Sequence, residues 1–334
     1  MHIVVAQPVE PDGLERARAI VPGASIEVVD PFGPDHVLPN HGAHVLFSDV
    51  APANVAEMVS LRWIQLASHG YSQFNGVVLP PGVWVCNASG VNDIPIAEWC
   101  VLMMLAFERD LVRLLAEQRA HRWNRDAKFQ AELHGRRVGI LGYGNIGQEL
   151  ARRCRALGLE IWALSRFRPG GRDLRYHPVE PAGPPPVPDR TFTSAQRREF
   201  LAGLDYLVVT MPVTSSTRDY LDREALAELP PHAVLLNPAR AQVVDEAALI
   251  DALRRGVVAG AALDDHYRQP MPPDDPFWDL PNTIVSAHVS GSTSSTYFRD
   301  RIWDLFCLNL QRYVAGDPLL NLIPHADLEL STPY

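Results

Sequence analysis

Three side chains able to take part in acid–base or carboxylate chemistry each follow a short apolar run in the second half of the chain. They are Arg240, Asp264 and His288. Parallel strands end at the same edge of a sheet, and ligands bind in the crevice at that edge, so such strands would bring these residues together. An arginine there can bind a carboxylate through two parallel hydrogen bonds. A histidine there can give or take a proton near neutral pH.

A glycine-rich loop earlier in the chain indicates what else this edge would hold. The apolar run Val138 to Leu141 predicts a buried strand, and Gln148 to Leu157 reads as a helix. The loop between them comprises Gly142, Tyr143, Gly144, Asn145, Ile146 and Gly147. At this spacing the first glycine permits the tight turn, the second lets a pyrophosphate approach, and the third brings helix and strand together. Unpaired N–H groups at the helix start suit a phosphate, so we predict a dinucleotide site.

The end of the next predicted strand, Ile161 to Leu164, favours NADP over NAD. An NAD site usually has Asp or Glu about 20 residues past the glycines, where it binds the ribose 2′-hydroxyl. This chain has Ser165 and Arg166 there, with Arg168 shortly after. A hydroxyl and a guanidinium suit a 2′-phosphate, because arginine pairs bidentately with phosphate oxygens. A solvated basic turn is the alternative.

The composition excludes several other classes of protein. With 334 residues and a net charge of −9, the chain is long enough for two domains and does not favour a nucleic-acid or anionic-membrane partner. The longest apolar run, Trp99 to Phe107, is far short of the about 20 residues of a membrane span, and no signal peptide is evident. The cysteines are scattered without a metal-binding pattern, at Cys86, Cys100, Cys154 and Cys307. We therefore expect a cytoplasmic protein with no metal site.

The first part of the chain reads as an α/β unit of its own. Short β-rich runs alternate with segments that read as helix or loop, such as Gly13 to Ile20 and Pro52 to Ser60. The predicted strands are His2–Ala6, Ile26–Val29, His44–Phe47, Trp63–Ala67 and Val83–Cys86. The stretch Ser68 to Tyr71 leaves one of these strands, at the place where ligand loops sit in open α/β sheets. A plain turn is the alternative for that stretch.

The middle of the chain holds two segments of opposite character. Apolar residues from Ile96 to about Glu117 predict one long helix. The proline-rich stretch Pro169 to Pro188 is expected to be an irregular surface excursion without a helix of its own. Such loops seldom contribute core contacts, so we expect a short Gly/Ser linker in place of Arg172 to Pro188 to change thermal stability little.

Alternation resumes in the second half of the chain. The predicted strands there are Tyr206–Met211, Ala233–Leu236, Val257–Leu263 and Thr283–Ser286, and the predicted helices are Asp222–Leu229, Asp245 to Gly256 and about Ser294 to Val314.

Several segments resemble the D-isomer-specific 2-hydroxyacid dehydrogenase family in order and spacing, over nearly the whole chain. They are Asn92–Glu98, Gly142–Gly147, Asn237–Leu249, Gly260–Asp264 and Ala287–Ser292. The resemblance implies an α/β fold of two Rossmann-like or flavodoxin-like domains, each with a doubly wound parallel sheet. It implies a cofactor domain, residues 95–295, inserted into a substrate domain, residues 1–94 and 296–334. It also implies a homodimer built mainly through the cofactor domains.

The resemblance assigns roles to individual residues. Arg240 resembles the arginine that binds the substrate carboxylate, His288 the acid–base histidine, and Asp264 the aspartate that positions the nicotinamide carboxamide. Backbone N–H groups around His69 and Gly70 would hold the substrate carboxylate. The residues expected along the cofactor, besides the glycine loop, are Ser165, Arg166, Met211, Pro212, Thr217, Ala239 and Ser290.

One position departs from the family pattern. The family usually has a glutamate before a proline a few residues beyond the aspartate, where it pairs with the histidine, whereas this chain has Gln269. A glutamine can orient the imidazole but supplies no charge to favour imidazolium. The aspartates that could supply that charge are Asp265, Asp274 and Asp275. If none does, Gln269→Glu should move the alkaline limb of a keto-acid reduction profile upward.

Gln269 also resembles the glutamine of formate dehydrogenases of the same superfamily, in a Gln-Pro-x-Pro setting, and Asn92 matches that group's substrate asparagine. Formate oxidation releases hydride and no substrate proton, so a neutral histidine partner is tolerable there. Against this reading, the other motifs match the wider family. Ser165 and Arg166 also depart from the acidic residue of most NAD-using members.

The sequence thus predicts an NAD(P)-dependent oxidoreductase, NADPH-preferring, that reduces a small 2-keto acid such as glyoxylate or hydroxypyruvate to the D-2-hydroxy acid. Arg240 would bind the carboxylate, His288 would donate the proton, and Gln269 would orient His288. Formate oxidation is the first alternative. A dinucleotide-sensing binding protein, like the corepressors that share this fold, is the second, and the presence of Arg240 and His288 favours an enzyme over it.

Overall fold

The computed structural model describes residues 1–39, 42–74, 76–165, 175–179, 186–325 and 328. The chain forms two compact units: unit 1 consists of Met1–Asn92, Arg172–Ala182 and Ser292–Tyr334, and unit 2 of Asp93–Gly171 and Gly183–Gly291. The chain therefore passes between the units four times. Within the described ranges, no helix is long and apolar enough to cross a membrane.

Unit 1 is built on a five-stranded parallel sheet in the order β2-β1-β3-β4-β5. Its strands are β1 (His2–Val5), β2 (Ser25–Val28), β3 (Val45–Phe47), β4 (Trp63–Gln65) and β5 (Trp84–Cys86). This is the flavodoxin-like doubly wound order. Each strand lies within the run that predicts it or one residue outside, and all but β2 are largely buried. Short 3₁₀ turns at Val55–Glu57 and Ser72–Phe74 complete the connections.

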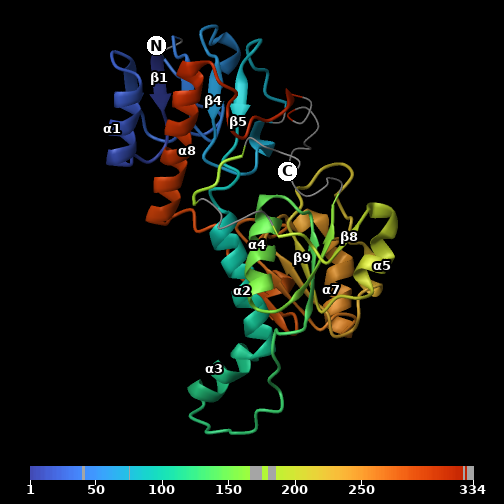
Figure 1. Ribbon diagram of the computed structural model, residues 1–334. Helices are drawn as coiled ribbons and strands as arrows, with labels where there is room; N and C mark the ends of the chain where they lie inside the picture. The colour runs from blue at the N-terminus through green and yellow to red at the C-terminus, as the bar shows by residue number, and fades with distance from the viewer. Residues whose placement is uncertain (40–41, 75, 166–174, 180–185, 326–327, 329–334) are drawn as a thin grey trace. The chain divides into compact units, whose positions relative to one another are not determined.

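Helices α1 (Pro11–Ile20) and α8 (Thr296–Ala315) lie side by side in unit 1 (Figure 1). The buried face of α8 supplies Trp303 and Phe306 to the core beneath the sheet. Phe306 stacks on Phe47 of β3 at 4.6 Å and on Trp63 of β4 at 5.5 Å between ring centroids. The apolar surface of a sheet formed early in the chain is thus covered by a helix near its end.

The proline-rich segment contributes a core residue to unit 1, so the expectation of a purely superficial excursion is wrong. The side chain of Tyr176 is 2% exposed and packs in the same cluster as Phe306. Its hydroxyl donates to Asp304 at 3.1 Å, and its backbone N–H donates to the side-chain oxygen of Asn321 at 3.2 Å. Gly90 is needed beside it, because a Cβ there would lie 2.1 Å from the Tyr176 carbonyl oxygen.

Unit 2 is built on a seven-stranded parallel sheet in the order β12-β11-β10-β9-β6-β7-β8. Its strands are β6 (Arg137–Leu141), β7 (Glu160–Leu164), β8 (Arg190–Phe192), β9 (Tyr206–Val209), β10 (Val234–Asn237), β11 (Gly260–Leu263) and β12 (Thr283–Val285). The strand order reverses between β6 and β9, the point where dinucleotides bind in Rossmann folds. The predicted fold class is confirmed, and only β8 is absent from the predicted strands.

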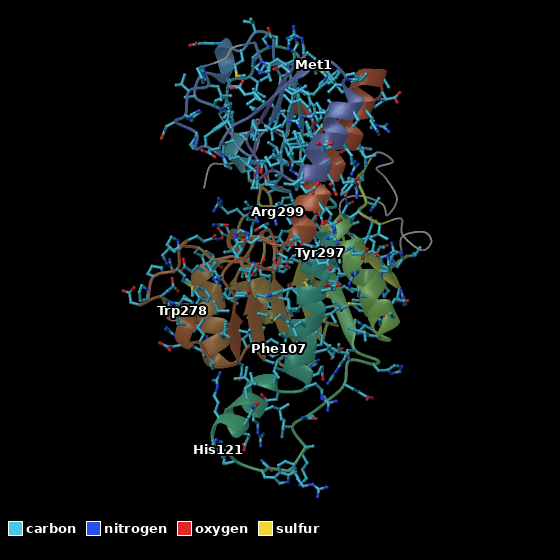
Figure 2. The ribbon with its side chains drawn as sticks, turned by 90° about the vertical axis from the view of Figure 1, so that its left-hand side faces the viewer. Met1, Phe107, His121, Trp278, Tyr297 and Arg299 are labelled. Carbon is cyan, nitrogen blue, oxygen red and sulfur yellow. The ribbon has the colours of Figure 1, made fainter. Side chains whose placement is uncertain are left out.

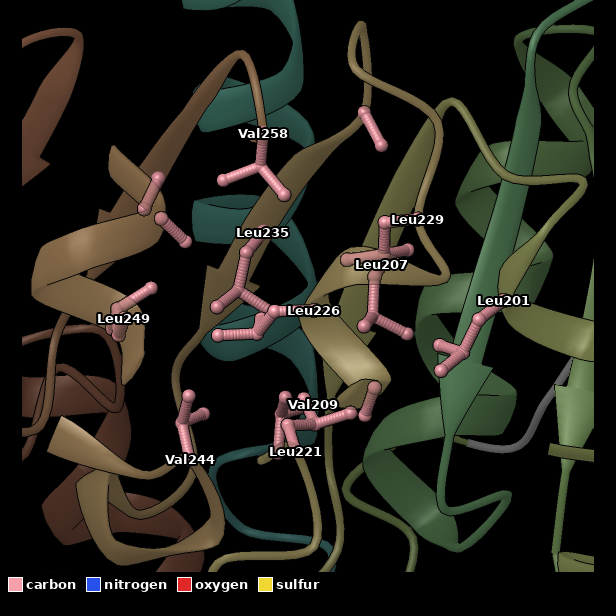
Figure 3. Packing of buried hydrophobic residues seen from close by; sticks show 14 of the residues in the cluster. Leu201, Leu207, Val209, Leu221, Leu226, Leu229, Leu235, Val244, Leu249 and Val258 are labelled. Atoms are coloured by element: carbon pink, nitrogen blue, oxygen red, sulfur yellow. The ribbon is translucent and has the colours of Figure 1, made fainter. Parts of the chain in front are cut away.

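Apolar residues cover both faces of this sheet, as parallel sheets require. On one face, residues of the sheet pack against α5 (Arg197–Leu201), α6 (Arg223–Ala227) and α7 (Glu246–Arg255). Figure 3 shows this packing, with Leu226 of α6 between Leu207 and Leu235 of neighbouring strands. On the other face the sheet packs against α2 (Asp93–Glu108) and α4 (Asn145–Ala156). The α4 helix begins earlier than predicted, directly after the second glycine of the loop.

The prediction of one long helix over residues 96–117 is wrong, because the helix breaks after Glu108. Asp110 adopts φ +47°, outside the helical region, and its side chain accepts a hydrogen bond from the backbone N–H of Arg113, which starts α3 (Leu111–Arg119). Glu108 faces the interior, where Tyr206 donates to it at 2.6 Å. Helix α3 and the loop after it, which contains His121, extend away from the sheet of unit 2 (Figures 1 and 2).

Candidate active site

Two of the three glycines of the loop after β6 are required by close contacts within the protein, and the third leaves open space. Gly142 has φ +102°, and a Cβ there would lie 2.8 Å from the backbone nitrogen of Met211. A Cβ at Gly147 would lie 2.6 Å from the carbonyl oxygen of Gly142, so a side chain would push α4 off the strand. A Cβ at Gly144 would meet nothing within 4 Å. The space in front of Gly144 is therefore open, as a phosphate approaching the backbone requires.

The start of α4 can receive an anion. Gly144 is its N-cap residue and makes no side-chain hydrogen bond to the first N–H groups of the helix. Asn145 is buried in the first turn, and Ile146 packs against the core of unit 2. The positive end of the helix dipole and the backbone N–H groups suit the pyrophosphate of a dinucleotide. These residues fit such a cofactor.

The neighbouring strands carry the other predicted cofactor residues to the same edge of the sheet. Met211 and Pro212 follow β9, and Met211 lies beside the first glycine. The hydroxyl of Thr217 donates to the Pro212 carbonyl at 2.7 Å and accepts from the backbone N–H of Thr214 at 2.7 Å, so it shapes this turn. Ser165 directly follows β7. Arg166 lies outside the described residues, so the NADP prediction is not tested by the geometry.

Arg240 follows β10 in a turn held by Asn237, the last residue of that strand. The Asn237 amide donates to the Arg240 carbonyl at 2.9 Å and accepts from the backbone N–H of Ala239 at 3.1 Å. Asn237 is 1% exposed, so both of its polar groups must be satisfied internally. The sequence placed Asn237 within a motif without giving it a role, and an amide at a buried strand end was the available signal.

Asp264, at the end of β11, is fully buried and holds the loop that carries His288. Its carboxylate accepts hydrogen bonds from the hydroxyl of Ser286 at 2.6 Å and from the backbone N–H groups of Val289 and Ser290 at 2.9 Å each. His288 has φ +54°, a conformation that costs a non-glycine residue about 1 kcal/mol or more. The bonds to Asp264 maintain it. A contact from Asp264 to nicotinamide remains a prediction.

His288 is anchored at one ring nitrogen and exposed elsewhere. Its Nδ1 lies 3.0 Å from the side-chain oxygen of Gln269 and 3.3 Å from Oδ1 of Asp265. Its side chain is 44% exposed, whereas that of Asp265 is 3% exposed. Of the three aspartates considered from the sequence, Asp265 is therefore the one that the structure brings to His288. Asp275 instead accepts from Arg268 at 2.8 Å.

The predicted substrate loop in unit 1 follows β4. The carbonyl of His69 accepts from Asn87 at 2.8 Å, and that of Gly70 accepts from the Ser68 hydroxyl at 2.9 Å. The backbone N–H of Gly70 donates no hydrogen bond within the described part of the chain. The side-chain oxygen of Asn92 is buried and has no partner among the described residues. Asn87 orients this loop and was not singled out from the sequence.

The four cysteines take no part in this site. All are buried and free, and burial raises the pKa of the Cys86 and Cys154 thiols to about 12. Such thiols stay protonated and are poor nucleophiles. In the ranges that the structure describes, no group of three or more His, Cys, Asp or Glu side chains is placed to hold a metal ion.

A glycine loop shaped for a pyrophosphate, at the same sheet edge as an anchored and exposed histidine, defines a dinucleotide-dependent dehydrogenase. The family profile of the D-isomer specific 2-hydroxyacid dehydrogenase, NAD binding domain, matches residues 101–290, more than half of the chain. The chain therefore belongs to the D-isomer-specific 2-hydroxyacid dehydrogenases, which are NAD(P)-dependent oxidoreductases.

Relatives and solved structures agree with this assignment. Glyoxylate/hydroxypyruvate reductase B of Pectobacterium carotovorum subsp. carotovorum (strain PC1) is 32% identical over 244 residues, which are 71% of this chain and 72% of that protein. D-3-phosphoglycerate dehydrogenase of Archaeoglobus fulgidus is 29% identical over 345 residues, 100% of this chain and 62% of that protein. The crystal structure of a D-isomer specific 2-hydroxyacid dehydrogenase from Xanthobacter autotrophicus Py2, in complex with NADPH and MES, is similar with a TM-score of 0.78, 26% identity and coverage of 97% and 98% of the two chains.

Proposed function

We propose that this enzyme reduces a small 2-keto acid, of the glyoxylate or hydroxypyruvate kind, to the D-2-hydroxy acid and prefers NADPH. A bound nicotinamide cofactor supplies hydride to the carbonyl carbon. Arg240 binds the carboxylate and polarises the carbonyl, and His288 gives a proton from Nε2 to the carbonyl oxygen as it becomes a hydroxyl. The observation that carries the proposal is the pairing of Nδ1 of His288 with Gln269, which leaves the opposite ring nitrogen for the substrate.

Two further observations support this substrate class. The Pectobacterium relative is named a glyoxylate/hydroxypyruvate reductase, and the Xanthobacter structure contains NADPH. In unit 1, the loop of His69 and Gly70 is shaped by hydrogen bonds to its carbonyl groups. A backbone N–H in this loop, such as that of Gly70, is a donor of the kind that binds a carboxylate.

Formate oxidation is the second candidate, and Gln269 is the observation that favours it. A neutral amide paired with the histidine suits formate oxidation, because the transfer of hydride from formate requires no proton from the protein. The buried carboxylate of Asp265, 3.3 Å from Nδ1 of His288, opposes it, because a nearby anion stabilises imidazolium. The two candidates separate in one assay: oxidation of NADPH by 2-keto acids against reduction of NADP⁺ by formate. Turnover with formate alone would replace the keto-acid proposal.

The cofactor preference can be tested at Arg166. Arg166→Ala is expected to raise the Michaelis constant for NADPH about tenfold or more and to leave that for NADH nearly unchanged, since only NADPH carries the 2′-phosphate that a guanidinium can bind. Arg198→Ala, an exposed arginine on α5, is the matched control. Steady-state kinetics with both cofactors decide the question. Equal effects on both constants, or a wild-type preference for NADH, would contradict the proposal.

We also infer a homodimer formed through unit 2. Helix α3 has no buried residue, and several large apolar side chains of α2, α3 and the following loop are exposed. They are Leu102, Leu105, Leu111, Val112, Leu114, Leu115 and Trp123. Large apolar side chains exposed together on two consecutive helices are typical of a protein interface, and a second copy of the chain can cover them with the same residues.

Light scattering tests this inference. The wild-type protein is expected at twice the 37.0 kDa of the chain. Val112→Asp should give a monomer, because a charge at the centre of an apolar interface is left unpaired. Val59→Asp, at a valine of unit 1 that is also exposed, should remain a dimer. A wild-type monomer, or a dimer that tolerates Val112→Asp, would show that this surface is not the interface.

A further inference from the structure

We propose that Asp265 is a positioning residue that holds His288 in the form needed to donate a proton, and that it acts through Gln269 as well as by its own charge. The inference deepens the proposed keto-acid reduction and rests on it for its catalytic consequence. Gln269 occupies the position where the family usually has a glutamate, and the carboxylate of Asp265 lies next to it.

The carboxylate fixes the orientation of the Gln269 amide. Oδ1 of Asp265 lies 2.7 Å from the side-chain nitrogen of Gln269, and an ionised carboxylate can only accept hydrogen bonds. The amide nitrogen must therefore face Asp265, and the amide oxygen faces His288, 3.0 Å from Nδ1. The second, longer contact of this nitrogen, to the His266 carbonyl at 3.4 Å, requires the same orientation.

The orientation of the amide in turn fixes the proton on the imidazole. Because the Gln269 oxygen is an acceptor, Nδ1 of His288 must carry a hydrogen in both the neutral and the charged ring. Exchange of a proton with a substrate is then confined to Nε2, the other ring nitrogen. Without an acceptor at Asp265, the amide could rotate by half a turn and present its nitrogen to Nδ1, which would exclude imidazolium. Gln269 without Asp265 thus does not determine which nitrogen of His288 carries the proton.

The same carboxylate supplies the charge that Gln269 lacks. Asp265 is buried and its Oδ1 lies 3.3 Å from Nδ1 of His288, which favours the protonated ring. Its other oxygen accepts from the backbone N–H of Ala241 at 2.7 Å, directly after Arg240. The Asp265 side chain therefore links two places, the turn that contains Arg240 and the ring of His288. Each of its oxygens has a partner.

Other charged groups at this end of the sheet are engaged elsewhere. The carboxylate of Asp264 is occupied by Ser286 and by two backbone N–H groups. Nε2 of His266 lies 2.7 Å from the Ser286 carbonyl, to which it donates, so this nitrogen has a partner of its own. Arg240, after β10, carries a positive charge at the same end of the sheet. Among the described carboxylates, Asp265 is the one that lies within 4 Å of the His288 ring.

Three variants and one control test the proposal in the full-length protein. Reduction requires protonated His288, so activity falls as pH rises and the ring loses its proton. Asp265→Asn removes the charge and should move this alkaline limb of the kcat profile down by about one pH unit. Gln269→Glu alone should leave the limb in place, because the new carboxylate shares a proton with Asp265. The double variant moves the charge to the usual family position and should restore the limb. Asp275→Asn removes a buried carboxylate of the same segment and should leave it unchanged.

A readout independent of turnover separates this inference from the proposed function. The Cε1–H resonance of His288, identified by its loss in His288→Asn, can be titrated by NMR in each variant. Asp265→Asn should lower the titration midpoint of that resonance even if no keto acid is a substrate. An unmoved midpoint in Asp265→Asn would overturn the proposal, as would an upward shift in Gln269→Glu alone. Should Asp265→Asn fail to fold, the Gln269→Glu result decides.

Discussion

Replacing His288 with asparagine is expected to lower kcat for keto-acid reduction by about a hundredfold to ten-thousandfold, the usual contribution of a general acid. NADPH affinity should change little, because His288 is not part of the glycine loop that would bind the pyrophosphate. Asparagine is the substitution of choice because His288 has φ +54°, and asparagine adopts the left-handed region more readily than most residues. The loop should therefore keep its shape while losing its proton donor.

The control for this variant is His232→Asn. His232 precedes β10, at the amino ends of the strands, whereas His288 lies at their carboxyl ends. The exposed ring of His232 lies 3.3 Å from Asp205. Stopped-flow measurement of NADPH oxidation should show wild-type turnover for this control. A loss smaller than about tenfold in His288→Asn would mean that the proton reaches the substrate by another route.

Tyr176→Ala is expected to destabilise unit 1 by about 3–5 kcal/mol, the usual cost of removing a large buried aromatic side chain. Tyr176 packs among the aromatic residues of unit 1, and burial raises the pKa of its phenol, which stays neutral and donates to Asp304. The melting transition of the unit should fall by about 10 °C in scanning calorimetry. The proline-rich segment would then be a structural part of a unit to which it is not contiguous in sequence.

Two milder variants make this result specific. Tyr176→Phe keeps the ring and loses one hydrogen bond, so a loss of about 1 kcal/mol is expected. Val179→Ala, at an exposed position of the same segment, should have no measurable effect. Equal stability of Tyr176→Ala and the wild-type protein would contradict docking of the segment on unit 1 and restore the view that it is dispensable.

The elements that could be predicted from the sequence are those that appear in it as a regular pattern of apolar residues. Parallel strands buried on both faces are largely apolar, so β6, β7 and β9 to β11 could be recognised without a structure, and the half-buried β12 still has two apolar residues. The glycine loop could be recognised because Gly142 and Gly147 are required by close contacts and Gly144 leaves room for a ligand. The break between α2 and α3 could not, since it depends on the left-handed conformation of Asp110, and apolar residues continue across it.

The remaining differences come from partners distant in sequence. Nothing within a proline-rich stretch shows that Tyr176 will be buried, because Gly90, Asp304 and Asn321 form its surroundings. Asp264 and Asp265 are identical residue types side by side. Only the path of the backbone after β11 directs one to the His288 loop and the other to the imidazole ring itself.

The division of unit 1 into separate stretches of chain also sets the order in which the protein can fold as it is synthesised. All five strands of its sheet lie before Asn87, but the helix whose aromatic rings cover them begins at Thr296. Unit 2 lacks nothing after Gly291. The unit that is translated later can therefore be completed first, while the earlier sheet has one apolar face covered only in part, by α1. Exposed apolar surface is prone to aggregation, so we expect the yield of folded enzyme in a cell to depend on how that face is protected until α8 emerges.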